Sequence, residues 1–309
     1  MLAITEKQEI SNMKEQKISV VLPAFREERV IGTVIQGVRA IMGSGCEIIV
    51  VDDGSSDGTG KAAEEAGARV VRHPYNMGNG AAVKSGIRAA TGDIIVMMDA
   101  DGQHKPEDIH RLIEQVGTYD MVIGARTGES ETSVHRDVAN AIYNRFATYL
   151  TKKEILDLTS GFRAIKADIA KRFVYLLPNT FSYPTTLTLS LIRSGHSVTF
   201  IPIVAKKREG KSKIKLLKDG VRFFLIMLKI ATLYSPFRVF LPVSVSFFGL
   251  GIGYYVYTFI TEHRFTNMSA LLISNGIIIF MMALIAEQIA QLRLDRTEET
   301  TSHRHTEKE

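Results

Sequence analysis

Two long uncharged runs near the end of the chain constrain its architecture most. Residues 239–261 and 265–286 contain no Asp, Glu, Lys or Arg, and only Glu262, His263 and Arg264 separate them. As helices they would be about 34 and 33 Å long at a rise of about 1.5 Å per residue. Both lengths exceed the hydrocarbon thickness of about 30 Å. We therefore expect a transmembrane hairpin rather than two buried core helices.

Basic residues crowd immediately before the first run and account for much of the net charge of +5. They are Lys206, Lys207, Arg208, Lys211, Lys213, Lys215, Lys218, Arg222, Lys229 and Arg238. Arg293 and Arg296 follow the second run, whereas the linker carries only Arg264. The positive-inside rule therefore predicts an integral membrane protein with two transmembrane helices, whose preceding domain and both termini are cytoplasmic.

Part of this basic cluster has helical spacing. Lys215, Lys218, Arg222 and Lys229 would share one face of a helix, and apolar residues lie between them. This pattern predicts amphipathic juxtamembrane helices in the headgroup layer, attracted by anionic lipid. A nucleic-acid-binding patch is the competing interpretation. Because no recognition motif accompanies it and the membrane runs follow directly, we expect no nucleic-acid partner.

The first two thirds of the chain alternate between strand-like and helix-like segments. Apolar stretches at 18–22, 48–51, 69–72 and 94–98 read as strands, and a helical period lies between the first two. Such alternation predicts βαβ units and an α/β fold with a mostly parallel sheet. The single cysteine, Cys46, excludes an internal disulfide, fits a reducing compartment and is interpreted as a buried structural thiol.

Asp99 and Asp101 directly follow the fourth apolar stretch. Open α/β sheets bind ligands at the carboxyl edge of their strands, which is where these side chains would lie. Carboxylate oxygens suit Mg²⁺ or Mn²⁺, although Asp and Gly also favour simple turns. The acidic loop 52–57 and the Gly-containing loop 73–80 would lie at the same edge. Together they favour a nucleotide pocket.

Seven separated motifs resemble the family-2 glycosyltransferases with a GT-A (Rossmann-like) fold. Within that family the chain is most similar to the polyprenyl- and dolichyl-phosphate hexosyl transferases, typified by dolichol-phosphate mannose synthase. The motifs are Pro23-Ala-Phe-Arg-Glu27, Val51-Asp-Asp-Gly-Ser-Ser-Asp-Gly-Thr59, Asn76-Met-Gly78, Asp99-Ala-Asp-Gly-Gln-His104, Gly124-Ala-Arg126, Ser160-Gly-Phe-Arg163 and Arg208-Glu-Gly-Lys-Ser-Lys213. Each is weak alone, but all seven occur in the family's order.

The resemblance implies metal-dependent, inverting transfer of a hexose from a nucleotide sugar to a polyprenyl or dolichyl monophosphate. GDP-mannose is the first choice of donor, followed by UDP-glucose or UDP-GlcNAc. Mg²⁺ or Mn²⁺ would be bound by Asp99, Asp101 and Gln103, and catalysis would involve Asp99, Asp101 and Arg208. The implied donor-binding residues are Pro23, Phe25, Glu27, Asp52, Asp53, Asp99, Ala100, Asp101, Gln103, Arg126, Arg208 and Lys213.

The acceptor phosphate would be held by Arg126, Arg136, Ser212 and Lys213. Arg136 and Arg163 rank lower as phosphate contacts, because a surface arginine is more often solvated or structural. Asp157 would touch sugar hydroxyls or cap a helix, and Asp57 would serve as a turn or cap residue. Lys84 would replace a phosphate-side cation of the family only if it faced the pocket, since the family's usual lysine position is Asn79 here. The loop 127–137 is expected to close over the acceptor groove.

We expect five segments along the chain. They are an N-terminal tail (1–17), a GT-A domain (18–210), amphipathic juxtamembrane helices (211–235), a transmembrane hairpin (236–290) and a polar tail (291–309). Expected partners are the nucleotide sugar, the lipid phosphate and the membrane, with a homo-oligomer left open. The alternatives are a membrane glycosyltransferase that elongates a glycan or glycolipid and, less favoured, a non-catalytic scaffold. Processive synthases carry a Gln-x-x-Arg-Trp segment, and this chain contains no Trp.

Overall fold

The computed structural model describes residues 16–127, 134–180, 182–205 and 235–306, together with 228 and 232. The chain divides into two compact units, 1–213 and 214–309, and each is described by itself. The expected juxtamembrane helices fall almost entirely outside the described residues, as do Arg208, Ser212 and Lys213.

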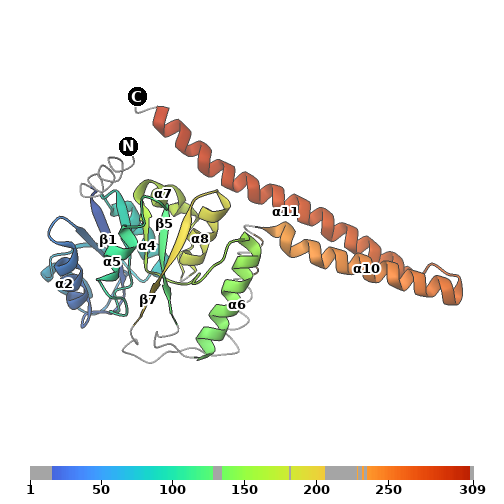
Figure 1. Cartoon of the computed structure of the whole chain (residues 1–309), viewed down its shortest axis with the longest axis horizontal. Coiled ribbons are helices and arrows are strands. Elements are labelled where there is room, and N and C mark those ends of the chain that lie inside the picture. The colour runs from blue at the N-terminus through green and yellow to red at the C-terminus, as the bar shows by residue number, and fades with distance from the viewer. Residues whose placement is uncertain are drawn as a thin grey trace, which may run out of the picture. The chain divides into compact units, whose positions relative to one another are not determined.

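One mixed sheet organises the described part of the first unit (Figure 1). Its strands are β1 (Ile18–Ala24), β2 (Glu47–Asp52), β3 (Arg69–Arg72), β4 (Ile94–Met97), β5 (Met121–Arg126), β6 (Arg163–Lys166) and β7 (Val198–Ile203), in the order β3-β2-β1-β4-β6-β5-β7. Strands β3, β2, β1 and β4 are mutually parallel, and β5 is parallel to β7. Only β6, among the described strands, runs antiparallel to its neighbours. The predicted mostly parallel α/β fold is confirmed.

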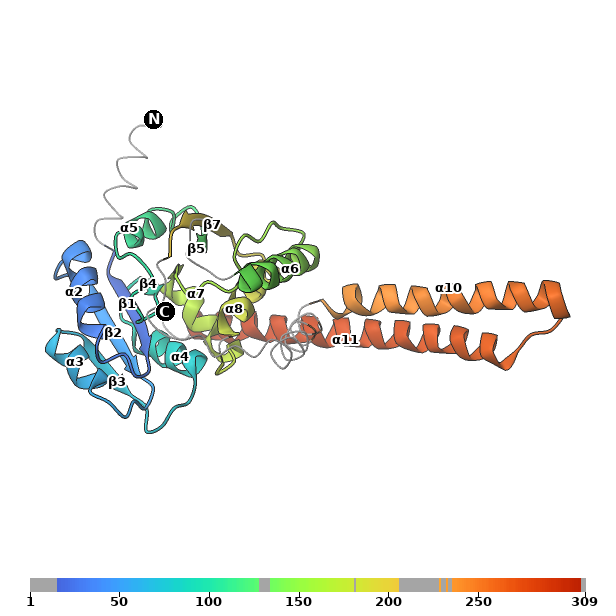
Figure 2. The same ribbon diagram turned by 90° about the horizontal axis from the view of Figure 1, so that it is seen from below.

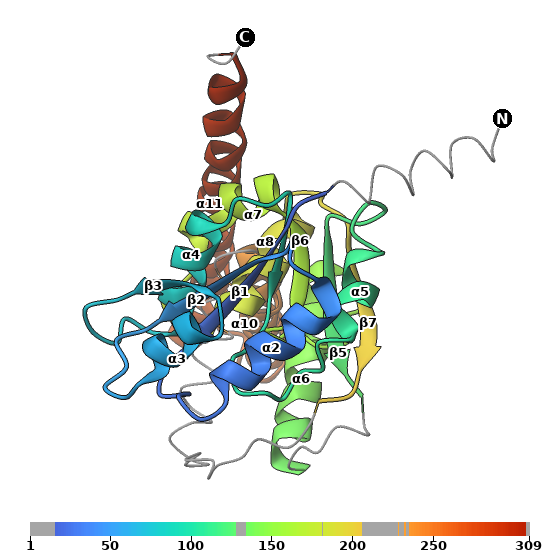
Figure 3. The ribbon, with the colours of Figure 1, turned by 90° about the vertical axis from the view of Figure 1, so that its left-hand side faces the viewer.

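Helices cover both faces of this sheet (Figure 3). They are α2 (Ile31–Met42), α3 (Thr59–Glu65), α4 (Asn79–Ala89), α5 (Asp108–Ile113), α6 (Val134–Thr151), α7 (Ala167–Phe173), the short 3₁₀ helix η1 (Val174–Leu176) and α8 (Tyr183–Arg193). Buried residues of α2, α3 and α5 pack on one face, and those of α4, α7 and α8 pack on the other.

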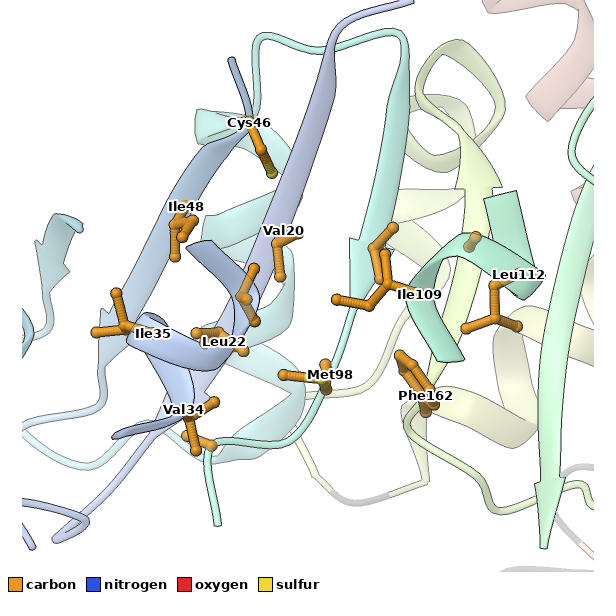
Figure 4. Packing of buried hydrophobic residues seen from close by; sticks show 14 of the residues in the cluster. Val20, Leu22, Val34, Ile35, Cys46, Ile48, Met98, Ile109, Leu112 and Phe162 are labelled. Carbon is orange, nitrogen blue, oxygen red and sulfur yellow. The ribbon is translucent and has the colours of Figure 1, made fainter. Parts of the chain in front are cut away.

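The continuous apolar runs are explained by this two-sided burial. Successive side chains of a strand point to opposite faces, so Val20 and Leu22 join the cluster under α2, whereas Val21 joins the cluster under α4. Figure 4 shows the first cluster, in which Ile35 and Ile109 reach the sheet from two different helices. Cys46 is part of it, and burial raises the pKa of its thiol to about 11, as expected for a structural cysteine.

The second unit contains a helical hairpin of α10 (Pro236–Glu262) and α11 (Asn267–Thr306), which run side by side (Figure 2). The segments Pro236–Glu262 and Asn267–Leu292 are each long and apolar enough to cross a membrane. The hydroxyl of Ser244 donates a hydrogen bond of 2.7 Å to the carbonyl of Gly276, which ties the two helices together. The helix α11 continues to Thr306, so most of the expected polar tail is helical.

Candidate active site

The parallel strands β1, β2 and β4 bring the predicted loops after Asp52 and Met97 to one sheet edge, together with the Pro23–Glu27 loop. The backbone N–H of Asp53 donates to the carbonyl of Ala24 at 2.9 Å, and that of Met98 donates to Val21 at 3.1 Å. Parallel neighbouring strands end side by side, so the segments that follow residues 24, 52 and 97 emerge together. This edge is where ligands bind in open α/β sheets.

The Asp99–Gln103 turn presents two carboxylates and an amide at that edge. The side chain of Asp99 is 37% exposed, whereas Ala100 between the carboxylates is buried. The Oδ1 atom of Asp101 accepts the backbone N–H of Gln103 at 3.2 Å, which fixes the turn.

This donor set fits a divalent ion that also binds a phosphate. Within the described ranges, no group of three or more His, Cys, Asp or Glu side chains could hold a metal on its own. The predicted ligand set of Asp99, Asp101 and Gln103 would need water and substrate oxygens to complete the coordination of an ion, and it stays a prediction. Mg²⁺ is usually bound in this way, through one or two carboxylates plus substrate phosphates.

The Ser160–Arg163 motif packs against Asp99 and its neighbour His104. A Cβ atom at Gly161 would lie 2.9 Å from Oδ2 and 3.0 Å from Oδ1 of Asp99, so a larger residue there would require the Asp99 carboxylate to shift. The next residue, Phe162, stacks on the ring of His104 with centroids 4.9 Å apart. The Nε2 atom of His104 lies 3.6 Å from Oδ2 of Asp99, and its Nδ1 is buried without a protein partner. Both motifs are evident in the sequence, but no role was predicted for His104 or Gly161.

Arg163 is fully buried, so the expectation of a surface location is wrong, whereas its low rank as a phosphate contact fits the structural hydrogen bonds that it makes. Its guanidinium donates to the carbonyls of Ser160 and Pro184 and to the hydroxyl of Thr188. Burial lowers its pKa to about 10, against the opposing influence of Tyr183, Asp157 and Asp99. At neutral pH it is thus a buried cation beneath an acidic site. Sequence could not reveal this, because a lone Arg in a loop motif usually lies at the surface.

Arg126 and Asp157 form a bidentate ion pair. The Nε–Oδ2 distance is 2.8 Å, the Nη2–Oδ1 distance is 3.0 Å, and the same guanidinium donates to Thr159 at 2.6 Å. Burial raises the pKa of Asp157, but the hydrogen bonds and charge of Arg126 outweigh it and hold that pKa below its usual range. Asp157 therefore orients Arg126 instead of capping a helix. The assignment of Arg126 to donor and acceptor phosphates stays a prediction.

Asp53 holds the neighbouring loop 73–78 with both carboxylate oxygens. Its Oδ1 pairs with Nδ1 of His73 at 2.7 Å and accepts the N–H of Met77 at 2.9 Å, and its Oδ2 accepts the N–H of Gly78 at 2.9 Å. The other ring nitrogen of His73 lies 2.8 Å from the hydroxyl of Ser85. Asp53 therefore stabilises the loop 73–78. Its predicted contact with the nucleoside stays a prediction.

The Pro23–Glu27 loop is fastened to the loop after β2. The N–H of Arg26 donates to Ser55 at 3.0 Å, and that of Glu27 donates to Thr59 at 2.9 Å. Arg26 has a φ of 60°, which is uncommon outside glycine, and its guanidinium lies 5.1 Å from the ring centroid of Phe25. Phe25 is 39% exposed, with the Arg26 guanidinium over its ring.

Other expectations for this region have mixed outcomes. Asp52 accepts the N–H of Ser55 at 3.0 Å, and Asp57 accepts the N–H of Thr59 at 3.2 Å, in the turn role expected for Asp57. The Nζ atom of Lys84 donates a hydrogen bond to Oδ1 of Asn179 at 2.8 Å. Its ammonium group therefore lies against the loop before α8.

Several predicted acceptor residues cannot be placed. Arg208, Ser212, Lys213 and residues 128–133 of the expected loop lie outside the described residues. The expected loop 127–137 is shorter than predicted, because residues 134–137 form the first turn of α6. Arg136 lies in the first turn of α6, where the structure describes the backbone but no side chain.

Known proteins resemble both units. Residues 19–173 match the family described as glycosyl transferase family 2, and residues 235–292 match the GtrB C-terminal hairpin. An undecaprenyl-phosphate mannosyltransferase of Micrococcus luteus is 32% identical over 54% of this chain and 75% of its own length. An undecaprenyl-phosphate 4-deoxy-4-formamido-L-arabinose transferase of Pectobacterium carotovorum is 30% identical over 55% of this chain and 58% of its own.

A solved structure shares the fold. Glucosyl-3-phosphoglycerate synthase from Mycobacterium tuberculosis, in complex with Mn²⁺, UDP-glucose and phosphoglyceric acid, has a TM-score of 0.57 and 22% identity. The match covers 72% of this chain and 82% of that one, and at this identity it shows the fold alone. The family match spans half of the chain and includes the Asp99–Gln103 turn. The chain therefore belongs to glycosyltransferase family 2 and is a glycosyltransferase with a GT-A fold.

Proposed function

We propose that this enzyme transfers a hexose from a nucleotide sugar to a polyprenyl or dolichyl monophosphate. The observation that carries the proposal is the combination, in one chain, of the Asp99–Gln103 turn with an apolar two-helix hairpin. A membrane hairpin would keep the enzyme at the bilayer, where a lipid acceptor is located. Two relatives whose names specify undecaprenyl phosphate as acceptor support the same conclusion.

Asp99, Asp101 and Gln103 would hold Mg²⁺ or Mn²⁺ together with the donor diphosphate. When bound, such an ion would neutralise the negative charge that develops on the leaving diphosphate. Mn²⁺ accompanies UDP-glucose in the mycobacterial synthase of the same fold, which supports a divalent ion. Gly161 leaves room for the Asp99 carboxylate and His104 lies beside it, and the partly exposed Phe25 would contact the nucleoside.

The acceptor needs no general base. A phosphate monoester has a second pKa of about 6 and is mostly dianionic at neutral pH. It can attack the anomeric carbon directly, which inverts the configuration there. The chain's task is to bring two anionic groups together, and guanidinium forks suit phosphate oxygens. We assign Arg126, oriented by Asp157, to this task, together with Arg136, Arg208, Ser212 and Lys213.

The donor is proposed to be GDP-mannose, with UDP-glucose or UDP-GlcNAc as the next choices. One relative is named for mannose and the other for a formamido-arabinose, so the names do not agree on one sugar. Basic residues before and after the hairpin support a cytoplasmic catalytic unit and cytoplasmic termini.

The test is a transfer assay with the purified full chain in liposomes. It is incubated with GDP- and UDP-sugars, a polyprenyl phosphate and Mg²⁺ or Mn²⁺, and the lipid product is identified by mass. We expect one nucleotide sugar to yield a lipid phosphosugar and Asp101→Asn to abolish the reaction while the protein remains folded. Asp168→Asn, which removes an exposed carboxylate paired with Arg172, is the matched control and should retain transfer. Full activity of Asp101→Asn would overturn the metal assignment.

A further inference from the structure

The outer face of α6 combines exposed apolar side chains with basic ones. On its inner side, Tyr143, Ala147 and Leu150 are at most 4% exposed. The opposite side carries Ile142 and Tyr149, which are 56% and 54% exposed although they are large and largely apolar. Their spacing of i, i+7 places them one above the other on the helix.

Basic residues flank this apolar pair. Arg145 lies at i+3 from Ile142 on the helix, and Lys152 and Lys153 directly follow Thr151, the last residue of α6, where Lys152 has a left-handed φ of 58°. All three are exposed, and none of the ion pairs among the residues the structure describes involves them. Between residues 141 and 156 the only acidic residue is Glu154. We call the surface formed by Ile142, Arg145, Tyr149, Lys152 and Lys153 the α6 outer face.

We propose that the α6 outer face lies in the headgroup layer of an anionic membrane. Tyrosine is enriched at the membrane–water interface because its ring is apolar and its hydroxyl is polar. Arg and Lys extend apolar stems along such a surface and place their charges among lipid phosphates. The net positive charge of the face thus matches an anionic leaflet. The hairpin α10–α11 would anchor the chain in such a membrane.

A second copy of the chain fits this face less well. A two-fold interface would place the same patch on both partners, so the cations of one copy would meet those of the other. No compensating carboxylate other than Glu154 lies in the segment. The inference goes beyond the proposed transfer reaction, since it concerns only how the first unit meets a bilayer and holds for any acceptor.

The absence of Trp from the chain makes a direct test simple. In the full chain, Tyr149→Trp introduces a single indole on the face, and Tyr175→Trp introduces one at a matched site, because Tyr175 in η1 is 53% exposed. Each variant is reconstituted in liposomes of phosphatidylglycerol with or without phospholipid brominated near the headgroup end of its acyl chains. We expect bromine to quench the Tyr149→Trp emission at least two-fold and to leave the Tyr175→Trp emission unchanged. Equal quenching of the two variants, or none of Tyr149→Trp, would overturn the proposal.

Charge reversal tests whether the basic residues of the α6 outer face are attracted to anionic lipid. Adding Arg145→Glu and Lys152→Glu to Tyr149→Trp should abolish most of the quenching in phosphatidylglycerol liposomes. The matched control adds Arg88→Glu and Lys171→Glu, which change the charge equally at positions of α4 and α7 and should preserve the quenching. If the Tyr149→Trp emission changed with the protein-to-lipid ratio but not with brominated lipid, a second copy of the chain would be the occupant. That result would refute the membrane assignment.

Discussion

Replacing Asp53 by Asn tests whether this carboxylate holds the 73–78 loop. Asp53 is 3% exposed and accepts hydrogen bonds from His73, Met77 and Gly78. An Asn side chain has only one acceptor oxygen, so whichever way it turns, its amide N–H₂ faces at least one of these donors. Losing one hydrogen bond to a charged group and leaving a buried donor unpaired costs roughly 1.5–3 kcal/mol.

That loss should be visible in thermal unfolding. For a domain of this size, 1 kcal/mol shifts the midpoint by about 2–4 °C, so Asp53→Asn should lower it by about 3–12 °C. The midpoint is measured by circular dichroism on the detergent-solubilised full chain without nucleotide. Asp57→Asn is the control, because Asn can accept the same local hydrogen bond from Thr59, and it should change the free energy of unfolding by less than about 1 kcal/mol.

A ligand role alone predicts a different pattern. If Asp53 served only to bind the nucleoside, Asp53→Asn would leave the midpoint of the nucleotide-free protein unchanged and weaken nucleotide binding. That result would refute the structural role of the Asp53 carboxylate.

Three further variants test neighbouring parts of the site. Arg163→Met leaves the buried carbonyls of Ser160 and Pro184 without their donor and should lower the free energy of unfolding by about 2–6 kcal/mol in urea titration, at about 1–3 kcal/mol for each carbonyl. A loss below about 1 kcal/mol would contradict this. Because the folded pKa of Asp157 is depressed, its contribution to stability is present above about pH 4 and is lost as the pH falls through the lower folded value. Asp157→Asn should therefore flatten the acid limb of the pH–stability curve, and an unchanged limb would argue against the ion pair. His104→Ala removes the ring beside Asp99 and should weaken Mn²⁺ binding about 10–100-fold by calorimetry, whereas equal affinity would show that Asp99 needs no such support.

Three strands of the parallel half, β1, β2 and β4, were predictable because they are buried on both faces. The runs around Val20, Ile49 and Ile95 contain almost no polar side chain, so they stand out without any alignment. Strand β6 gave no such signal, since it has four residues and charged ones at both ends. The hairpin was predictable because its two uncharged apolar runs are long enough to cross a membrane. The extension of α11 to Thr306 was not predictable, because its polar end lacks an apolar face.

The site was predictable in position but not in internal bonding. The order of strands and acidic loops placed Asp53 and Asp99 at one edge. Sequence could not show that Asp53 is already bonded to loop 73–78, or that Gly161 leaves room for the Asp99 carboxylate. These relations depend on residues far apart in the chain, and each single residue also has an ordinary turn or surface interpretation.

The acceptor is the most direct test of the proposed function. The purified full chain in liposomes is given its preferred nucleotide sugar with either a polyprenyl phosphate or the same polyprenol without phosphate, and the lipid product is measured by mass. We predict a lipid phosphosugar from the phosphate and no product from the alcohol, because the phosphate dianion is the nucleophile and no general base is required. Transfer to the polyprenol, or to a glycan acceptor with none to the lipid phosphate, would contradict the account.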